Sequence, residues 1–293
     1  MSVNTCRLCG ASELHTIYTG PIRAGGADSG KVDGFSIRGC AACGIEFLDP
    51  FPEDTEAYYT GKEYWEDHHG PVNVAKLHAK HGPEQRRWFY EVGGETLRGQ
   101  RVVDFGCGAG IFLDMAKGLA AETIGVDLAE HFREHLHSQG HQFLRGSDGL
   151  ANDSVDVVVS FDTLEHVPDP VAFLKEIRRV LKPGGQAFLG MPNQDDFLKK
   201  FIAEYIPFFY HLSHLYYFSA RALQFSFEQA GFADIAIGNV HKYDLTNMLV
   251  WARDRKGVGT PGSDVFDAFA EDAWRANLER QGIASHLFAV VRK

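Results

Sequence analysis

The sequence predicts an α/β protein, a largely parallel sheet covered by helices on both faces, with a small metal-binding module in front of it. From residue 100 onward, short apolar runs alternate with amphipathic helical patterns, which is typical of βαβ units. Two Cys-x-x-Cys pairs lie in the first 52 residues, and a glycine-rich turn spans 106–110. The alternation predicts the sheet, the cysteine pairs predict the module, and the glycine-rich turn predicts where the sheet binds a ligand.

The first module is predicted from its four cysteines, Cys6, Cys9, Cys40 and Cys43. Each pair leads into a glycine, which suits two tight knuckles whose thiolates converge on one ion. Four thiolates at this spacing favour structural Zn²⁺ in a closed tetrahedral site. Redox dithiols or disulfides are the alternative, which the doubled spacing and a reducing compartment disfavour. We therefore expect a zinc-ribbon-like zinc-binding module over residues 1–52.

Residues 53–95 are rich in aromatic and charged side chains and are predicted to form a helical linker. Tyr64 and Trp65 would either cap a bound cofactor or fill an interdomain core, and we favour the core. The segment also holds four histidines, for which solvated positions are favoured over a site: His68, His69, His78 and His81.

The remaining domain, 96–293, alternates strands and helices. Its strands are expected at 102–104, 123–127, 143–144, 156–160, 186–190, 235–240 and 287–292, and its helices at 111–119, 130–139, 171–181 and 220–230. The run 156–160 is apolar throughout, as in a strand covered on both faces. Segment 241–284, with a helix near 264–281, is expected as an insertion between the last two strands.

One motif in the second helix resembles a metal site. His131 and His135 match H-x-x-E-H, a zinc-peptidase pattern, and their spacing places both on one helix face. This helix is expected to lie along the outside of the sheet, away from the ligand site. We therefore interpret the pair as part of a solvated helix face.

The glycine-rich turn reads Asp104-x-Gly106-x-Gly108-x-Gly110 and follows an apolar strand. Glycine allows a tight turn and close approach of a ligand, and free backbone N–H groups there favour a nucleotide-like cofactor. Ile111 stands where the dinucleotide fingerprint needs a small residue, and no Walker A Gly-Lys-Ser/Thr follows. A second acid, Asp127, lies at the interval from which an acid reaches ribose hydroxyls.

Three further segments accompany this turn: 154–160 with 163–167, 179–185, and 214–219 with 230–232. In combination with the turn and Asp127, they resemble the class I S-adenosylmethionine (SAM) dependent methyltransferases. The resemblance implies a seven-stranded Rossmann-like sheet whose last strand runs antiparallel, and it implies SAM as the cofactor.

The resemblance also implies roles for individual residues. Gly106, Gly108 and Gly110 would pass the methionyl end of SAM, with Asp104 holding its amino group. Asp127 would bind the ribose hydroxyls, and Leu128 would pack beside the adenine ring. Asp148 would contact the adenine amino group. Phe161 and Asp162 would face the reactive end of the cofactor.

A four-cysteine module joined to this domain is similar to bacterial sugar methyltransferases and related small-molecule methyltransferases. In the sugar C-methyltransferases, the region that aligns with 211–214 reads Tyr-His-Glu-His. Here it is His211-Leu212-Ser213-His214, so only the last histidine is shared. We therefore expect O-methylation of a sugar, nucleotide-sugar or other secondary metabolite, with C-methylation as an alternative.

Methyl transfer to a hydroxyl needs alignment and a base. His214 is the first choice for that base, because it precedes the helix at 220–230, and His166 is the second. Aromatic residues are dense in 197–218 and would either line the acceptor pocket or form an ordinary lid core.

Composition limits the partners. The formal net charge is −10, and residues 1–52 hold four basic side chains against five acidic ones. An RNA-binding module should be basic, so an RNA methyltransferase is the less favoured alternative and a non-catalytic zinc protein the least. No apolar run approaches the ~18 residues of a membrane helix, and no signal peptide is evident. We expect a cytoplasmic enzyme of undetermined oligomeric state.

Overall fold

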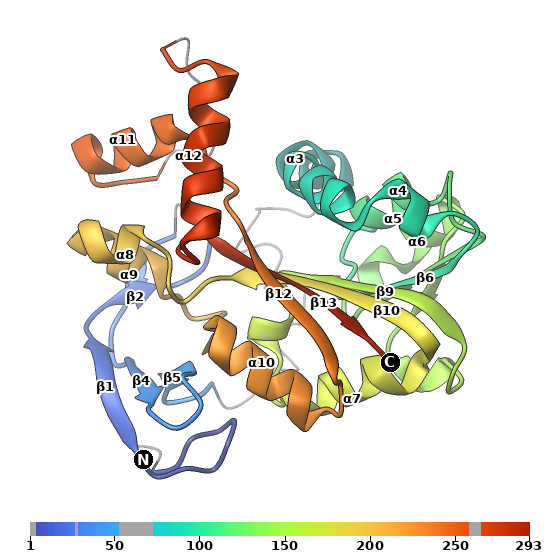
Figure 1. Cartoon of the computed structure of the whole chain (residues 1–293), viewed down its shortest axis with the longest axis horizontal. Helices are drawn as coiled ribbons and strands as arrows, with labels where there is room; N and C mark the ends of the chain where they lie inside the picture. The colour runs from blue at the N-terminus through green and yellow to red at the C-terminus, as the bar shows by residue number, and fades with distance from the viewer. Residues whose placement is uncertain (1–3, 27–28, 53–72, 258–264) are drawn as a thin grey trace. The chain divides into compact units, whose positions relative to one another are not determined.

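The computed structural model describes residues 4–26, 29–52, 73–257 and 265–293. The expectations for Tyr64, Trp65, His68 and His69 lie outside the described residues. The chain divides into two compact units (Figure 1). Unit 1 comprises residues 1–51, 191–225 and 237–288, and unit 2 comprises 52–190, 226–236 and 289–293.

A seven-stranded sheet is the main element of the fold, in the order β12-β13-β10-β9-β6-β7-β8. Its strands are β6 (Arg101–Phe105), β7 (Glu122–Val126), β8 (Gln142–Leu144), β9 (Val155–Phe161), β10 (Leu181–Pro192), β12 (Asp234–Val240) and β13 (His286–Arg292). The four neighbouring pairs from β10 to β8 are parallel. The last strand lies between the fifth and the sixth, which confirms the predicted seven-stranded Rossmann-like sheet.

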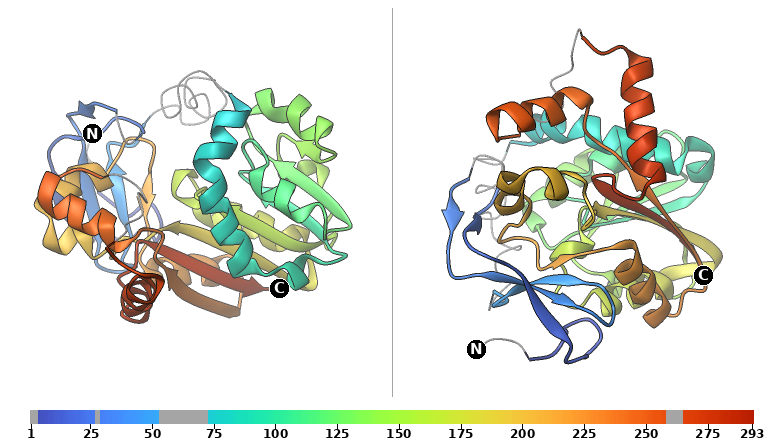
Figure 2. Two further views of the ribbon diagram at one scale, coloured as in Figure 1. Left: turned by 90° about the horizontal axis from the view of Figure 1, so that it is seen from above. Right: turned by 60° about the vertical axis from the view of Figure 1, so that its left-hand side comes forward.

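Helices alternate with these strands in the chain. They are α3 (Val74–Val92), α4 (Gly94–Leu97), α5 (Ile111–Ala116), α6 (Arg133–Ser138), α7 (Pro170–Val180) and α10 (Ala220–Gln229), with short 3-10 turns η1 (Glu130–Phe132), η2 (Ser147–Gly149) and η3 (Leu164–His166). Helix α3 packs beside α5 (Figures 1 and 2). Their apolar faces share one buried core with Phe132, Leu136 and Phe143, which fixes α5 directly behind the glycine-rich turn.

Some boundaries differ from the expected ones. Helix α5 ends at Ala116, before Gly118, because glycine disfavours a helix interior. The second helix opens with a 3-10 turn, η1, before α6 begins. Strand β10 begins at Leu181 rather than 186, and its pairing with β9 shifts register between Leu181 and Gln186. The Pro-Gly-Gly sequence is thus an irregularity inside a strand instead of a loop before it.

In unit 1, the segment that carries the cysteines is joined to residues from far along the chain. Strands β1 (Leu14–Thr19), β4 (Ser36–Cys40), β5 (Glu46–Asp49) and β11 (Tyr216–Tyr217) form one sheet, in which Tyr216 pairs with Phe47. Strands β2 (Ile22–Arg23) and β3 (Lys31–Val32) form a second ribbon. The helical elements are α8 (Leu198–Phe201), η4 (Ala203–Tyr205), α9 (Ile206–Phe209), α11 (Leu245–Asp254) and α12 (Ala268–Arg280).

The core of unit 1 has the same mixed origin. Ile37 and Leu48 from the first segment are buried in one cluster with Tyr210, Trp251 and other aromatic side chains. By contacts, then, residues 1–51 are one compact unit with 191–225 and 237–288, whereas the sequence placed a module boundary at 52. None of the helices in the described ranges is long and apolar enough to cross a membrane.

Candidate functional site

The glycine-rich turn follows strand β6 directly. Gly106 has φ +84°, and an added Cβ there would lie 2.2 Å from the Oγ1 atom of Thr163. The turn is therefore closed to any side chain at this position, because such an atom would collide and the backbone would be strained. Gly108 and Gly110 also have positive φ. Thr163 packs against the turn at Gly106 and Leu136 packs against it at Gly110, so glycine is required here for tight packing as well as for backbone conformation.

Asp127 holds the same turn from the end of β7. Its two carboxylate oxygens accept hydrogen bonds from the backbone N–H groups of Gly108 and Ala129, both at 2.7 Å. Burial raises the pKa of Asp127, although these two hydrogen bonds act in the opposite direction. Each carboxylate oxygen has a second lone pair, so the bonds to the turn leave acceptor capacity for ribose hydroxyls. That role remains a prediction.

Asp104 lies near the carboxyl end of β6 and is 5% exposed. Burial, together with the charge of Asp127, raises the pKa of Asp104 to about 8. A buried carboxyl group of this kind is unfavourable when ionised unless a cation compensates it. The amino group that the family resemblance assigns to Asp104 is such a cation, so the residues present fit SAM.

Strand β9 ends at Phe161 and Asp162 follows it, and Trp88 of α3 contacts both. The Trp88 and Phe161 rings stack with centroids 4.9 Å apart, and Trp88 Nε1 donates to Asp162 Oδ2 at 3.4 Å. Asp162 has φ +53°, a conformation that Asp tolerates better than most residues. This role of Trp88 was not predictable from the sequence, because one aromatic residue among many in a helix gives no signal of its own.

The two remaining predicted cofactor residues differ in exposure. Leu128 is partly buried beside Asp127, whereas Asp148 is exposed on the turn η2 after β8. Cys107, inside the glycine-rich turn, is buried, and burial raises the pKa of its thiol. A protonated, buried thiol is a poor nucleophile, so Cys107 has a packing role.

The four cysteines converge, as their spacing predicts. Sγ of Cys6 lies 3.7 Å from that of Cys43, and Sγ of Cys9 lies 3.6 Å from that of Cys40. All four sulfurs lie within 4.8 Å of one another. Four thiolates around one zinc ion at about 2.3 Å have neighbouring sulfurs about 3.8 Å apart. The donor set therefore fits Zn²⁺, and Gly44 at positive φ closes the second knuckle.

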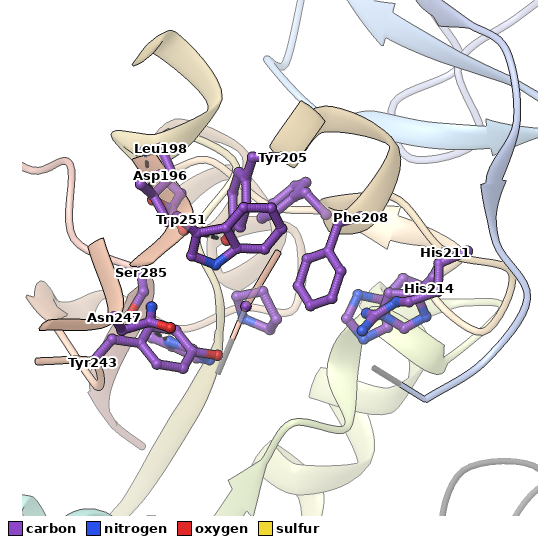
Figure 3. Close-up of a pocket in the computed structure, with 15 residues that line it drawn as sticks. Asp196, Leu198, Tyr205, Phe208, His211, His214, Tyr243, Asn247, Trp251 and Ser285 are labelled. Atoms are coloured by element: carbon purple, nitrogen blue, oxygen red, sulfur yellow. Dashed lines mark hydrogen bonds between the residues drawn. The ribbon is translucent and has the colours of Figure 1, made fainter. Parts of the chain in front are cut away.

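Unit 1 encloses a pocket of about 500 Å³, all of whose lining residues belong to that unit. Figure 3 shows Phe208, His211 and His214 on one side, and Tyr243, Asn247 and Ser285 at the other end. The rest of the lining includes Tyr205, Phe209 and Trp251, with Arg23 from strand β2. The aromatic segment 197–218 thus lines a pocket and contributes to the core as well.

His214, the first choice for the base, has its ring against this pocket. Its ring centroid lies 3.6 Å from that of His211, and its backbone N–H donates to the His211 carbonyl at 3.1 Å. The Tyr217 hydroxyl accepts from the His211 N–H and donates to its carbonyl, which fixes the loop. His166, the second choice, lies at the end of η3 in unit 2 and is partly buried.

Two polar pocket residues have shifted pKa values. Burial raises the pKa of Asp196 to about 6, although the Leu198 N–H and the Tyr205 hydroxyl both donate to it. Burial lowers the pKa of Arg23, whose guanidinium lies over the Phe208 ring at 4.4 Å. Neither residue was singled out from the sequence, because each becomes part of a site only through the joining of distant segments.

Comparison with known proteins agrees with this geometry. Residues 78–237, more than half of the chain, match a methyltransferase domain family. This chain belongs to that methyltransferase domain family. The match spans the glycine-rich turn, Asp127 and the strand β9, so it rests on the residues that carry the sequence resemblance.

Individual relatives give a finer comparison. The chain is 37% identical over 120 residues to the ubiquinone biosynthesis O-methyltransferase of Idiomarina loihiensis, covering 38% of this chain and 49% of that protein. It is 31% identical over 166 residues to that of Xanthomonas campestris, covering 50% and 67%. The chain spans about half the length of the first of these relatives.

Solved structures share the fold. A SAM-dependent methyltransferase from Archaeoglobus fulgidus aligns with a TM-score of 0.50 at 20% identity, over 75% of this chain and 95% of that one. Phosphoethanolamine N-methyltransferase 2 of Haemonchus contortus, solved with SAM, aligns with a TM-score of 0.51 at 18% identity, over 85% and 62%. At these identities the likeness shows the fold alone.

Proposed function

We propose that this protein transfers the methyl group of SAM to a hydroxyl group of a small molecule held in the unit 1 pocket. The family assignment and the turn at Gly106–Gly110 support SAM as the donor. The observation that carries the acceptor proposal is a pocket of about 500 Å³ with aromatic walls and a histidine ring in its lining, a size and composition typical of small-molecule sites.

The bound cofactor supplies an electrophilic methyl group on a sulfonium, and the residues supply binding, alignment and proton removal. Asp104 and Asp127 would hold the amino and ribose groups. Phe161 and Asp162, both in contact with Trp88, would lie toward the reactive end. His214 takes the proton of the acceptor hydroxyl, a contribution of typically ~10²–10⁴-fold in rate.

Arg23 supports an acceptor that carries negative charge, such as a nucleotide-sugar. Its side chain lies in the pocket lining, its Nε atom is buried without a hydrogen-bond partner, and among the described residues no carboxylate lies within ion-pair distance of it. An enclosed guanidinium is stabilised by an anion, and planar bidentate contacts to phosphate suit it. The four-cysteine module, with Zn²⁺, would keep strand β4 in place, and Ile37 of this strand is buried in one cluster with the pocket residues Tyr205 and Trp251.

The experiment is turnover of SAM with a panel of hydroxylated metabolites, phosphorylated and not, followed by variants on the best acceptor. His214→Ala should abolish turnover while SAM affinity, measured by calorimetry, stays nearly unchanged. Unchanged turnover would remove His214 as the base, and the same test on His166→Ala would then follow.

Arg23→Gln should raise KM for a phosphorylated acceptor by about tenfold or more, with little change in kcat, since a charge-assisted hydrogen bond contributes about 1.5–3 kcal/mol. Arg253→Gln is the matched control, because Arg253 is exposed and pairs with Asp254 on the surface of the same unit. Equal KM values for the two variants would contradict the anionic acceptor and leave the methyl transfer itself untouched.

A further inference from the structure

Three metal-binding side chains meet in unit 2, apart from the glycine-rich turn and the cysteines. They are His78 of α3, Asp114 of α5 and His135 of α6, and one ligand atom of each lies within 4.8 Å of the other two. The three come from different helices, so their meeting is a product of the tertiary fold. Nothing in the cofactor-binding scheme uses them.

The two imidazoles present buried nitrogens to this cluster. Nε2 of His78 and Nε2 of His135 are both buried, and neither has a hydrogen-bond partner among the described residues. Their ring centroids lie 5.9 Å apart with an interplanar angle of 87°. Buried polar atoms are nearly always satisfied, and an exception calls for a water or an ion. Two such atoms in one cluster point to a shared partner.

The carboxylate is oriented for the same partner. Asp114 Oδ1 accepts from Lys117 Nζ at 2.8 Å and contacts His141 Nε2 at 3.2 Å. Asp114 Oδ2 lies 3.8 Å from His78 Nε2, beyond hydrogen-bond distance. Hydrogen bonds to one oxygen of a carboxylate fix the other toward a metal, as outer-shell partners do in known sites.

The network extends one residue further and keeps the carboxylate charged. His141, 4% exposed, is held on its other nitrogen by Thr123 Oγ1 at 2.7 Å. Burial acts to raise the pKa of Asp114, but the contacts with Lys117 and His141 lower it on balance. The cluster thus offers two imidazoles and one ionised carboxylate.

We propose that His78, Asp114 and His135 bind Zn²⁺ as a second metal site, distinct from the cysteines. Two imidazoles and a carboxylate with a water in the fourth position are an established zinc donor set. Nitrogen and oxygen ligands bind zinc at about 2.0–2.1 Å, so in a tetrahedral site they lie ~3.4 Å apart; here Asp114 Oδ2 lies 3.8 Å from His78 Nε2.

The site fastens α3 to the cofactor side of unit 2. Helix α5 begins at Ile111, directly after Gly110, and α3 carries Trp88 against Phe161. A metal that bridges α3, α5 and α6 stabilises their packing, because ligands that bind only the folded state add to its stability. His135, discounted in the sequence as half of an H-x-x-E-H pair, acts here with His78 in place of His131.

The test is the zinc content of the full-length protein after loading with excess Zn²⁺ and desalting, measured by elemental analysis. We expect His78→Ala and Asp114→Asn each to lose one equivalent relative to the wild type. His81→Ala is the matched control, because His81 lies one turn further along α3 and pairs with Glu84, and it should lose none. An equal loss in the control, or equal content in all four proteins, overturns the proposal.

Loading with Co²⁺ separates this site from the cysteines. The thiolate-to-cobalt charge-transfer band belongs to the cysteine site and should persist in His78→Ala. The additional, weaker d–d absorption of the second site should be lost in that variant. Should the variants fail to fold, X-ray absorption of the zinc-loaded wild type decides the question. It should show nitrogen or oxygen ligands besides sulfur, and sulfur alone overturns the proposal.

Discussion

Binding of SAM should release a proton from Asp104, and the affinity should depend on pH accordingly. In the unliganded protein burial raises the pKa of this carboxyl to about 8, so it is neutral at pH 6–7. To accept a hydrogen bond from the ammonium of SAM as an ion pair, it must ionise. An α-amino group has a pKa of about 7.7–8.0, so below pH 7 the ligand keeps its charge and Asp104 alone loses a proton.

The magnitude follows from the pKa. Below pH 7 each unit of pH changes the ionised fraction of Asp104 about tenfold, so Kd for SAM should rise about tenfold between pH 7 and pH 6, or about 1.4 kcal/mol. Calorimetry at pH 6.5 in two buffers of different ionisation enthalpy should report release of close to one proton.

One test variant and one control variant show whether Asp104 causes the pH dependence. Asp104→Asn cannot release a proton, so its affinity should be weaker and nearly flat over this range. Asp148→Asn is the control, because Asp148 is exposed and any loss of adenine contact would leave the slope unchanged. A Kd that is constant from pH 6 to 7 in the wild type, or heats independent of the buffer, would refute the reasoning.

Further predictions concern stability and the metal. The pKa of Asp104 in the folded protein lies above its ordinary 3.8, so its contribution to stability is full at low pH and is lost as the pH rises toward 8. The difference in Tm between unliganded Asp104→Asn and the wild type should therefore shift in favour of the variant over that range. Gly106→Ala should destabilise the fold by about 1–3 kcal/mol and weaken SAM binding, because the new methyl group meets Thr163; wild-type affinity in calorimetry would contradict this. Trp88→Ala should lower the urea-derived free energy of unfolding by about 3–5 kcal/mol, since Trp88 is fully buried, and a loss under 1 kcal/mol would be inconsistent with the packing. Cys6→Ser should lose the zinc of the first module and lower the Tm, whereas a metal content equal to the wild type would exclude the four-cysteine site.

Local signals in the sequence predicted the family and the sheet, while the cofactor roles of individual residues stay predictions. The turn at Gly106 and the acid at Asp127 lie within about 20 residues of each other, and both follow strands that periodicity identifies. The Cys-x-x-Cys pairs likewise needed only their spacing. The boundaries of helices and strands were predicted less accurately. The 3-10 turn η1 and the irregularity within strand β10 depend on tertiary packing, which the secondary-structure propensities of single residues do not describe.

The acceptor side was not predictable in the same way. Arg23 lies 191 residues before His214 in the chain, yet both line one pocket. Tyr216 likewise joins a sheet whose other strands end at Asp49. His78 and His135 were interpreted from the sequence as solvated residues, and Asp114 was not singled out. The periodicity of a short stretch of sequence does not predict which distant segments contact one another in the fold.

The sequence by itself therefore determined the family, the sheet and the donor end of the chemistry, because glycine conformation, strand-end acids and thiolate spacing are properties of short stretches of chain. Only the tertiary structure decided that the cysteine segment forms one unit with residues 191–225 and 237–288 and that Trp88 contacts Phe161 and Asp162. It also decided which side chains line the pocket and which meet at His78, Asp114 and His135. The physical reason is that burial and desolvation, which raise the pKa of Asp104 and enclose Arg23, are set by neighbours far away in sequence.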